Sequence, residues 1–241
     1  MANGQNAAQG MQASATITAA SWTAQSNTYP IRPGYAQNIF DGDLVALDVD
    51  GFLVNYYDII ANPPFVYANF GMPATSQPIP TLGVFIGCTY ATSNQAQVDY
   101  ASPGRPYWPA GTTTAINQQP IGFVIDDPNA TYNIQSGPAG FTQANCGGMV
   151  NVSYQVVGGL VQGNFQDGTS LMFANVAQSG QTFVQHAPAN IQPGFPADSA
   201  IYRPLLVKQI VPILNNNAGV PYNNAEVVIT NHVWRLGSTG N

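Results

Sequence analysis

Paired carboxylates are the first groups in this chain that could do chemistry. Asp126 and Asp127 stand directly before Pro128 and are the only adjacent acidic residues. Such a pair can act as general acid and base or can hold a metal ion. Neighbouring residues on a strand point to opposite faces, however, and Asp before Pro commonly opens a turn. We therefore interpret the pair as a turn rather than as a catalytic centre.

A second acidic patch comprises Asp41, Asp43, Asp48 and Asp50. Hard cations favour oxygen ligands that lie close together, so the patch is a candidate for a metal site. It lacks the regular spacing and the terminal Glu of a calcium loop, and turn chemistry explains it better. We expect no bound metal here.

Other catalytic signatures are weak. His186 and His232 are the only histidines, and neither has a Cys, His or carboxylate neighbour at metal-ligand spacing. A Ser/His/Asp hydrolase would need residues from distant parts of the chain, because no Gly-x-Ser-x-Gly elbow is present. We expect no enzyme activity and no cofactor.

Cys88 and Cys146 could pair only if the fold brings them together, and we interpret each as a small apolar core residue.

The charge content restricts the partners. Only 7% of the 241 residues are charged, against about 25% in ordinary soluble domains. Polar character comes from Asn, Gln, Ser and Thr, and a surface of this kind suits a chain that is packed against neighbours. The net charge is −6 and the five basic residues are scattered, so neither nucleic acid nor an anionic membrane is an expected partner.

The elements that would position these residues are strands. Two strand-like runs, 44–49 and 52–57, flank Asp50-Gly51, a strong signal for a hairpin with a type I′ turn. Residues 206–214 and 226–236 could form a second, wide hairpin. Helical periodicity is nearly absent, apart from a short turn around 142–146. Further candidate strands, separated by Gly, Pro, Asn and Asp, are 82–90, 122–126, 132–135, 150–157, 170–177 and 182–186.

This pattern predicts an all-β fold, a barrel or sandwich with long Pro/Gly-rich loops and an extended N-terminal arm. The arm is residues 1–30, which carry few large apolar side chains. It is either a disordered terminus or a strap that orders on a neighbouring subunit through Trp22 and Tyr29. Residues 31–241 form the β-rich part, as one domain or as two subdomains with a boundary near 136–148.

Arg105, Tyr107 and Trp108 are the remaining candidate interface residues. They lie in a Pro-rich segment, and Arg, Tyr and Trp are favoured anchors of protein interfaces. The segment is either an exposed recognition loop or a strand end at which Trp108 caps the core. The sequence does not choose between the two.

As a set, several motifs resemble the capsid decoration, or cement, proteins of tailed bacteriophages, from about Ile31 to the end of the chain. The resemblance implies β-rich subunits, often trimers, that sit on the outer capsid lattice and strengthen it, and it carries over no catalytic residue. The motifs are Ile31-x-Pro-Gly-Tyr35, Gly42-Asp43-Leu44-Val45, Leu82-Gly83-Val84-Phe85-Ile86-Gly87-Cys88-x-Tyr90, Tyr107-Trp108-Pro109-x-Gly111, Val124-Ile125-Asp126-Asp127-Pro128, Tyr132-x-Ile134-Gln135 and Val228-Ile229-x-Asn231-His232.

The expected function is that of a virion structural protein, a homotrimer on the outer capsid surface that binds the major capsid protein and stabilises the lattice. One alternative is the base of a head fibre or a module that binds a receptor or carbohydrate. A more remote one is a glycan-hydrolysing enzyme, in which Asp126 or Asp127 would act with Asp43 or Glu226.

Overall fold

A computed structural model describes residues 9–17, 25–61, 80–92, 103–115, 118–176, 204–212, 216–230 and 232–234. Strands dominate this part of the chain, and the fold is a sandwich-like packing of antiparallel sheets rather than a closed barrel. The all-β prediction is confirmed. The helical elements among the described residues are the short helix α1 (Tyr56–Ala61) and the 3-10 turn η1 (Gln143–Asn145). No helix in these ranges is long and apolar enough to cross a membrane.

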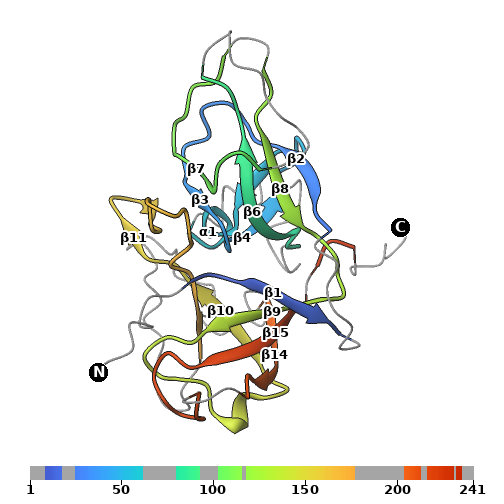
Figure 1. Ribbon diagram of the computed structural model, residues 1–241, viewed down its shortest axis with the longest axis vertical. Coiled ribbons are helices and arrows are strands. Elements are labelled where there is room, and N and C mark those ends of the chain that lie inside the picture. Colours follow the sequence, from blue (N-terminus) through green and yellow to red (C-terminus); the bar gives the residue numbers. More distant parts are fainter. Residues whose placement is uncertain are drawn as a thin grey trace, which may run out of the picture.

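Two sheets form the body of the molecule (Figure 1). The six-stranded sheet, in the lower half of the view, has the order β1 (Gln12–Thr16), β9 (Ala130–Gln135), β15 (Asn224–Ile229), β14 (Leu205–Ile210), β10 (Met149–Ser153) and β13 (Phe173–Asn175). The five-stranded sheet, in the upper half, has the order β2 (Asn27–Pro30), β8 (Ile121–Ile125), β6 (Gly83–Thr89), β4 (Leu44–Leu47) and β5 (Leu53–Asn55). All neighbouring strands in both sheets are antiparallel.

Two short ribbons complete the set of strands. β3 (Ile39–Phe40) pairs with β7 (Tyr107–Trp108), and β11 (Val156–Val157) pairs with β12 (Leu160–Val161). The β11–β12 ribbon projects from the side of the molecule in Figure 1.

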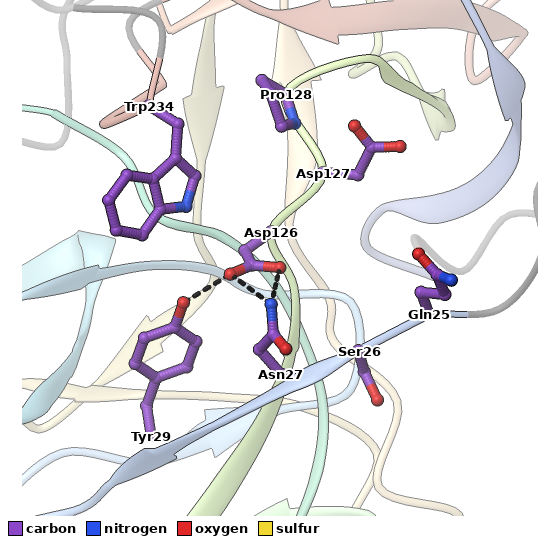
Figure 2. A pocket seen from close by; sticks show the side chains of 8 residues that line it. All are labelled: Gln25, Ser26, Asn27, Tyr29, Asp126, Asp127, Pro128 and Trp234. Atoms are coloured by element: carbon purple, nitrogen blue, oxygen red, sulfur yellow. Dashed lines mark hydrogen bonds between the residues drawn. The ribbon is translucent and has the colours of Figure 1, made fainter.

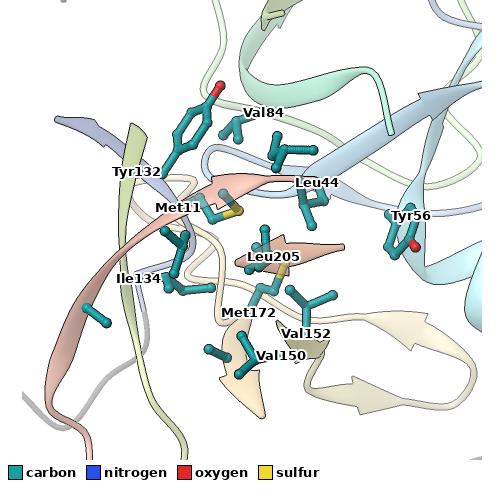
Figure 3. Close-up of a cluster of buried hydrophobic side chains, with 14 of the residues drawn as sticks. Met11, Leu44, Tyr56, Val84, Tyr132, Ile134, Val150, Val152, Met172 and Leu205 are labelled. Carbon is teal, nitrogen blue, oxygen red and sulfur yellow. The ribbon is translucent and has the colours of Figure 1, made fainter. Parts of the chain in front are cut away.

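Apolar side chains pack on both faces of the five-stranded sheet. Because side chains alternate along a strand, Leu44 and Ala46 of β4 enter a first core cluster, while Val45 enters a second. The first cluster lies between the two sheets and includes Leu205 and other side chains of the six-stranded sheet (Figure 3). Burial on both faces explains why this strand is continuously apolar in sequence.

The predicted hairpin at Asp50-Gly51 is confirmed, but its turn is not type I′. Only Gly51 has a positive φ, +80°, and the Gly51 N–H donates to the Asp48 carbonyl at 3.0 Å. This is a type I turn followed by a left-handed residue, the pattern of a longer hairpin loop. The Asp48 side chain stabilises it by accepting the N–H groups of Asp50 and Phe52 at 3.0 and 2.8 Å.

The second half of the 52–57 run does not continue as a strand. β5 ends at Asn55, and α1 begins at Tyr56. The Asn55 side chain accepts the N–H of Tyr57 at 2.9 Å, as the residue before a helix commonly does. Asn55 therefore ends the strand and caps the helix that follows.

The described parts of the N-terminal segment are extended, as predicted, but they pair within their own chain. β1 adds to the edge of the six-stranded sheet beside β9, and β2 adds to the edge of the five-stranded sheet beside β8. Met11 is fully buried in the first core cluster and supplies the apolar contact that holds this segment. These parts are therefore ordered against their own chain.

The chain passes between the two sheets twice, first from β1 to β2 and again from β8 to β9, at residues 126–129. The second crossing lies before the subdomain boundary expected near 136–148. The wide C-terminal hairpin is confirmed, since β14 pairs with β15.

Candidate functional site

A surface cleft of about 820 Å³ opens beside the turn that joins β8 to β9 (Figure 2). One wall is β2 and the residues before it, namely Gln25, Ser26, Asn27 and Tyr29. The opposite side is the turn 126–128 together with Trp234. The cleft therefore brings together three segments that are far apart in sequence.

Hydrogen bonds to Asp126 connect β2 to the end of β8. The Asp126 carboxylate is buried, and its two oxygens accept the Asn27 side-chain amide at 2.8 and 3.0 Å. The Tyr29 hydroxyl donates to the same carboxylate. Asn27 and Tyr29 reach it together because residues two apart on a strand share a face. Burial raises the pKa of Tyr29, and the hydrogen bond to Asp126 and the charge of that carboxylate raise it further.

Asp127 opens the turn that the sequence predicted. Its carboxylate accepts the N–H of Asn129 at 2.8 Å, and its carbonyl accepts the N–H of Ala130 at 3.0 Å. The Asp126 and Asp127 side chains point in different directions from this turn (Figure 2). Neither Asp43 nor Glu226, the partners considered for an acid pair, is among the described residues that line the cleft.

Sequence reasoning did not single out four residues of the cleft, of which Trp234 is the largest; the others are Gln25, Ser26 and Asn27. The Trp234 side chain is 60% exposed although it is the largest apolar group at the site. The main chain around it is fixed: the Val233 N–H donates to the Thr81 carbonyl at 2.9 Å, and the Trp234 N–H donates to Nδ1 of buried His232 at 3.2 Å. These bonds fix the main chain that carries the exposed indole.

The other acidic patch divides between two places. Asp43 is fully buried and accepts the Phe40 N–H at 2.9 Å, the Asn55 amide at 2.8 Å and the Ser170 hydroxyl. Burial raises the pKa of Asp43 to about 7, although these three hydrogen bonds act to lower it. Burial, with a smaller contribution from Asp167, raises the pKa of Asp41 to about 6.

Asp48 and Asp50 lie at the first hairpin and share one arginine. Nη2 of Arg32 is 2.9 Å from the Asp48 carboxylate and 2.8 Å from that of Asp50. The same guanidinium lies 4.6 Å from the centre of the Phe52 ring. Turn and hairpin chemistry thus accounts for this half of the patch. Within the described ranges, His, Cys, Asp and Glu side chains form no group of three or more that could hold a metal ion.

Trp108 is a core residue and does not lie in an exposed recognition loop. Its side chain is fully buried in the second cluster, and its ring meets that of Tyr90 edge-on at 5.1 Å. Tyr107 is half-buried and stacks on Phe40 at 5.2 Å. Arg105 is exposed, with its guanidinium 4.3 Å from the centre of the Tyr90 ring.

The remaining candidates are distributed differently. Tyr29 lines the cleft, whereas Trp22 and His186 lie outside the described residues. Cys88 and Cys146 are both free thiols. Cys88 is buried in the second cluster, as predicted, and burial raises its pKa to about 12. Cys146 is half-buried at the edge of the first cluster.

The comparisons with known proteins add no relative: no family model, curated protein or solved structure matches this chain.

Proposed function

We propose that this chain is a virion structural protein that decorates a capsid and stabilises its lattice by binding major capsid protein subunits. The proposal comes from the motifs that resemble phage decoration proteins. Several of those motifs belong to the framework of the fold. Residues 42–45 include the first half of β4, residues 82–90 include all of β6, and residues 124–128 comprise the end of β8 and the turn that follows. Their residues serve packing and turn formation, the roles that a structural subunit requires.

One observation supports the proposal most strongly: the few carboxylates are used to hold the fold together. Asp43 joins three segments of the core, Asp126 joins two strands, and Glu226 accepts Lys208 at 3.1 Å and Gln209 at 2.6 Å. The other described carboxylates that accept hydrogen bonds or ion pairs from the chain itself are Asp48, Asp50, Asp58, Asp127 and Asp167. Apart from the cleft beside the β8–β9 turn, what remains for partners is a surface of amides, hydroxyls and scattered apolar groups.

The mechanism is mass action. A protein that binds only the assembled lattice stabilises that lattice, and many copies multiply the effect. A symmetric homotrimer would present each contact surface three times, which raises the effective concentration of the second and third contacts. The outer capsid surface is the location at which such contacts can form after assembly.

The test uses expanded shells of the major capsid protein encoded in the same genome, prepared without this chain. We expect the purified protein to sediment with the shells and to raise the temperature at which they come apart. Failure to sediment, or an unchanged disassembly temperature at saturation, would contradict the proposal. The copy number separates it from its closest rival, because a few copies per particle would indicate a fibre base or receptor-binding module instead.

Light scattering of the purified chain tests the oligomeric state separately. A mass three times that of the 25.5 kDa chain is expected, and a stable monomer would contradict the homotrimer.

A further inference from the structure

The cleft beside the β8–β9 turn has the composition of a site for a cationic group. Its lining includes the carboxylates of Asp126 and Asp127 and the aromatic rings of Tyr29 and Trp234. Among the described residues that line it, none is basic. Carboxylates attract a cation by charge, and an aromatic face attracts it through the ring quadrupole. The two effects act together on a ligand that carries both a positive charge and a flat surface.

The chain itself builds such a site at its first hairpin. There the Arg32 guanidinium lies over the Phe52 ring and contacts the carboxylates of Asp48 and Asp50. One aromatic ring and two carboxylates thus hold one guanidinium. The cleft contains the same kinds of group, with Trp234 as the ring and Asp126 and Asp127 as the acids, although these two side chains point in different directions.

The basic side chains that the structure describes are engaged elsewhere. Arg32 is held at the hairpin, Arg105 lies over the Tyr90 ring, and Lys208 is paired with Glu226. A cation for the cleft therefore comes from outside this set. Arg203 and Arg235 lie outside the described residues, and Arg235, which follows Trp234 in the sequence, is the competing occupant that the variant Arg235→Ala tests.

The groups of the cleft are positioned before any ligand arrives. Asn27 and Tyr29 fix the orientation of the Asp126 carboxylate, and main-chain hydrogen bonds fix the segment that carries Trp234. Preorganisation of this kind reduces the entropy that binding must overcome. It also favours a planar, forked cation over a point charge, because a guanidinium can stack on an indole while its edge donates to a carboxylate.

We propose that this cleft receives an arginine side chain of a partner protein. The inference rests on the proposed function in that the partner would be a capsid subunit, and it supplies the polar contact of that interface. Trp234 provides the stacking surface, Asp126 the fixed acceptor, and Asp127 the second negative charge at the rim.

The test follows the indole N–H signals of the ¹⁵N-labelled full chain during titration with N-acetyl-arginine amide. Trp234→Phe assigns the relevant signal among the three tryptophans. We expect a saturable shift of that signal that is lost in about 1 M salt, where screening acts within about 3 Å. N-acetyl-citrulline amide, which has the same shape without the charge, should cause no saturable shift. Methyl glucoside, a neutral sugar, should likewise cause no saturable shift.

Matched variants assign the effect to the cleft. Asp127→Asn, followed by the Trp234 indole signal, and Trp234→Leu, followed by the backbone amide signals of cleft residues such as Asn27, should each weaken binding by about fivefold, the loss expected for one exposed charge or ring contact. Asp50→Asn removes the same charge at the hairpin, and Val157→Ala removes an exposed apolar side chain from β11; neither should change the affinity.

Three results would overturn the inference. The first is that the citrulline or glucoside probe binds as tightly as the arginine probe. The second is that neither cleft variant changes the affinity for arginine. The third is that arginine binds only to the Arg235→Ala variant, which would make Arg235 the occupant of the cleft. If the protein binds shells but not the arginine probe, this inference alone fails. If it binds arginine but not shells, the proposed function fails.

Discussion

Single hydrogen bonds to buried carboxylates connect distant segments of this chain. Asp126 receives donors from Asn27 and Tyr29, which precede it by 99 and 97 residues. A buried carboxylate is costly unless donors satisfy it, so each of these donors contributes to the docking of β2. The same logic applies to Asp43, whose donors come from residues 40, 55 and 170.

Tyr29→Phe tests the first of these contacts. The change removes one donor from the Asp126 carboxylate and keeps the ring, so we expect the free energy of unfolding to fall by about 1–3 kcal/mol. Urea denaturation followed by circular dichroism measures the change. Tyr107→Phe is the matched control, because that ring stacks on Phe40 while the described residues supply its hydroxyl with no hydrogen bond. Equal effects of the two variants would contradict the role given to Asp126.

The raised pKa of Asp43 predicts a pH dependence of stability. In the folded chain its pKa is about 7, against an ordinary value of 3.8. Between these values the folded state binds more protons than the unfolded state, so stability must fall as pH rises. Asp41, with a pKa of about 6, acts in the same direction. We expect these two carboxyl groups to make the free energy of unfolding larger near pH 4 than near pH 8, by an amount on the order of a few kcal/mol.

Denaturation at several pH values measures this dependence, and two variants separate its origin. Asp43→Asn should make the free energy of unfolding depend less steeply on pH between about pH 4 and pH 7, because the amide does not titrate. Asp167→Asn should change that window only slightly, through the smaller contribution of Asp167 to the pKa of Asp41. Hydrogen bonds from Thr169 lower the pKa of Asp167 itself and place its own titration at more acidic pH. A wild-type stability that rises from pH 4 to pH 8 would contradict the prediction.

At the scale of elements, the first hairpin depends on the left-handed conformation of one residue. Gly51 has a φ of +80°, and a Cβ added there would meet no atom within 4 Å. Gly51→Ala therefore changes backbone strain without changing packing. We expect the free energy of unfolding to fall by about 1 kcal/mol, measured by thermal or urea denaturation. Gly104→Ala is the control, because its φ is ordinary and its nearest neighbour would be Oγ1 of Thr89 at 3.7 Å. A loss at Gly104 as large as that at Gly51 would rule out this account.

Local patterns predicted most of the strands and the two hairpins. Among the described residues, the apolar runs 82–90, 122–126 and 132–135 became β6, β8 and β9, and the short turn expected around 142–146 is η1. The type of the first turn was wrong, because the sequence signal Asp-Gly fits both a type I′ turn and a type I turn followed by Gly in the left-handed region. The predicted strand 182–186 lies outside the described residues.

The cleft was less predictable than the strands that carry it. Asp127 and its turn follow from local sequence, because Asp before Pro is a local signal. The position of Trp234 depends on the bridge between His232 and Thr81, which no sequence spacing indicates. Likewise, Tyr29 reaches Asp126 only because β2 pairs with β8, with Tyr29 opposite Gly122. Long-range register decides both contacts, and a single sequence carries little information on register between distant strands.

At the scale of the whole molecule, the first core cluster joins the two sheets. Leu44 belongs to the five-stranded sheet and Leu205 to the six-stranded sheet, yet both are fully buried in this cluster (Figure 3). Each sheet therefore uses the other to bury its apolar face. A core shared in this way predicts that the sheets unfold together, although, apart from β1, the strands of the five-stranded sheet precede those of the six-stranded sheet in the sequence.

Calorimetry of two matched leucine variants tests this cooperativity. Leu44→Ala and Leu205→Ala should each lower the free energy of unfolding by about 2–5 kcal/mol, because each leaves a cavity in the shared cluster. Both should lower the temperature of a single transition, whichever sheet carries the change. Leu160→Ala on β12, where the side chain is 37% exposed, should shift that temperature far less. Two separate transitions, with each core variant moving only one of them, would mean that the sheets fold as independent subdomains.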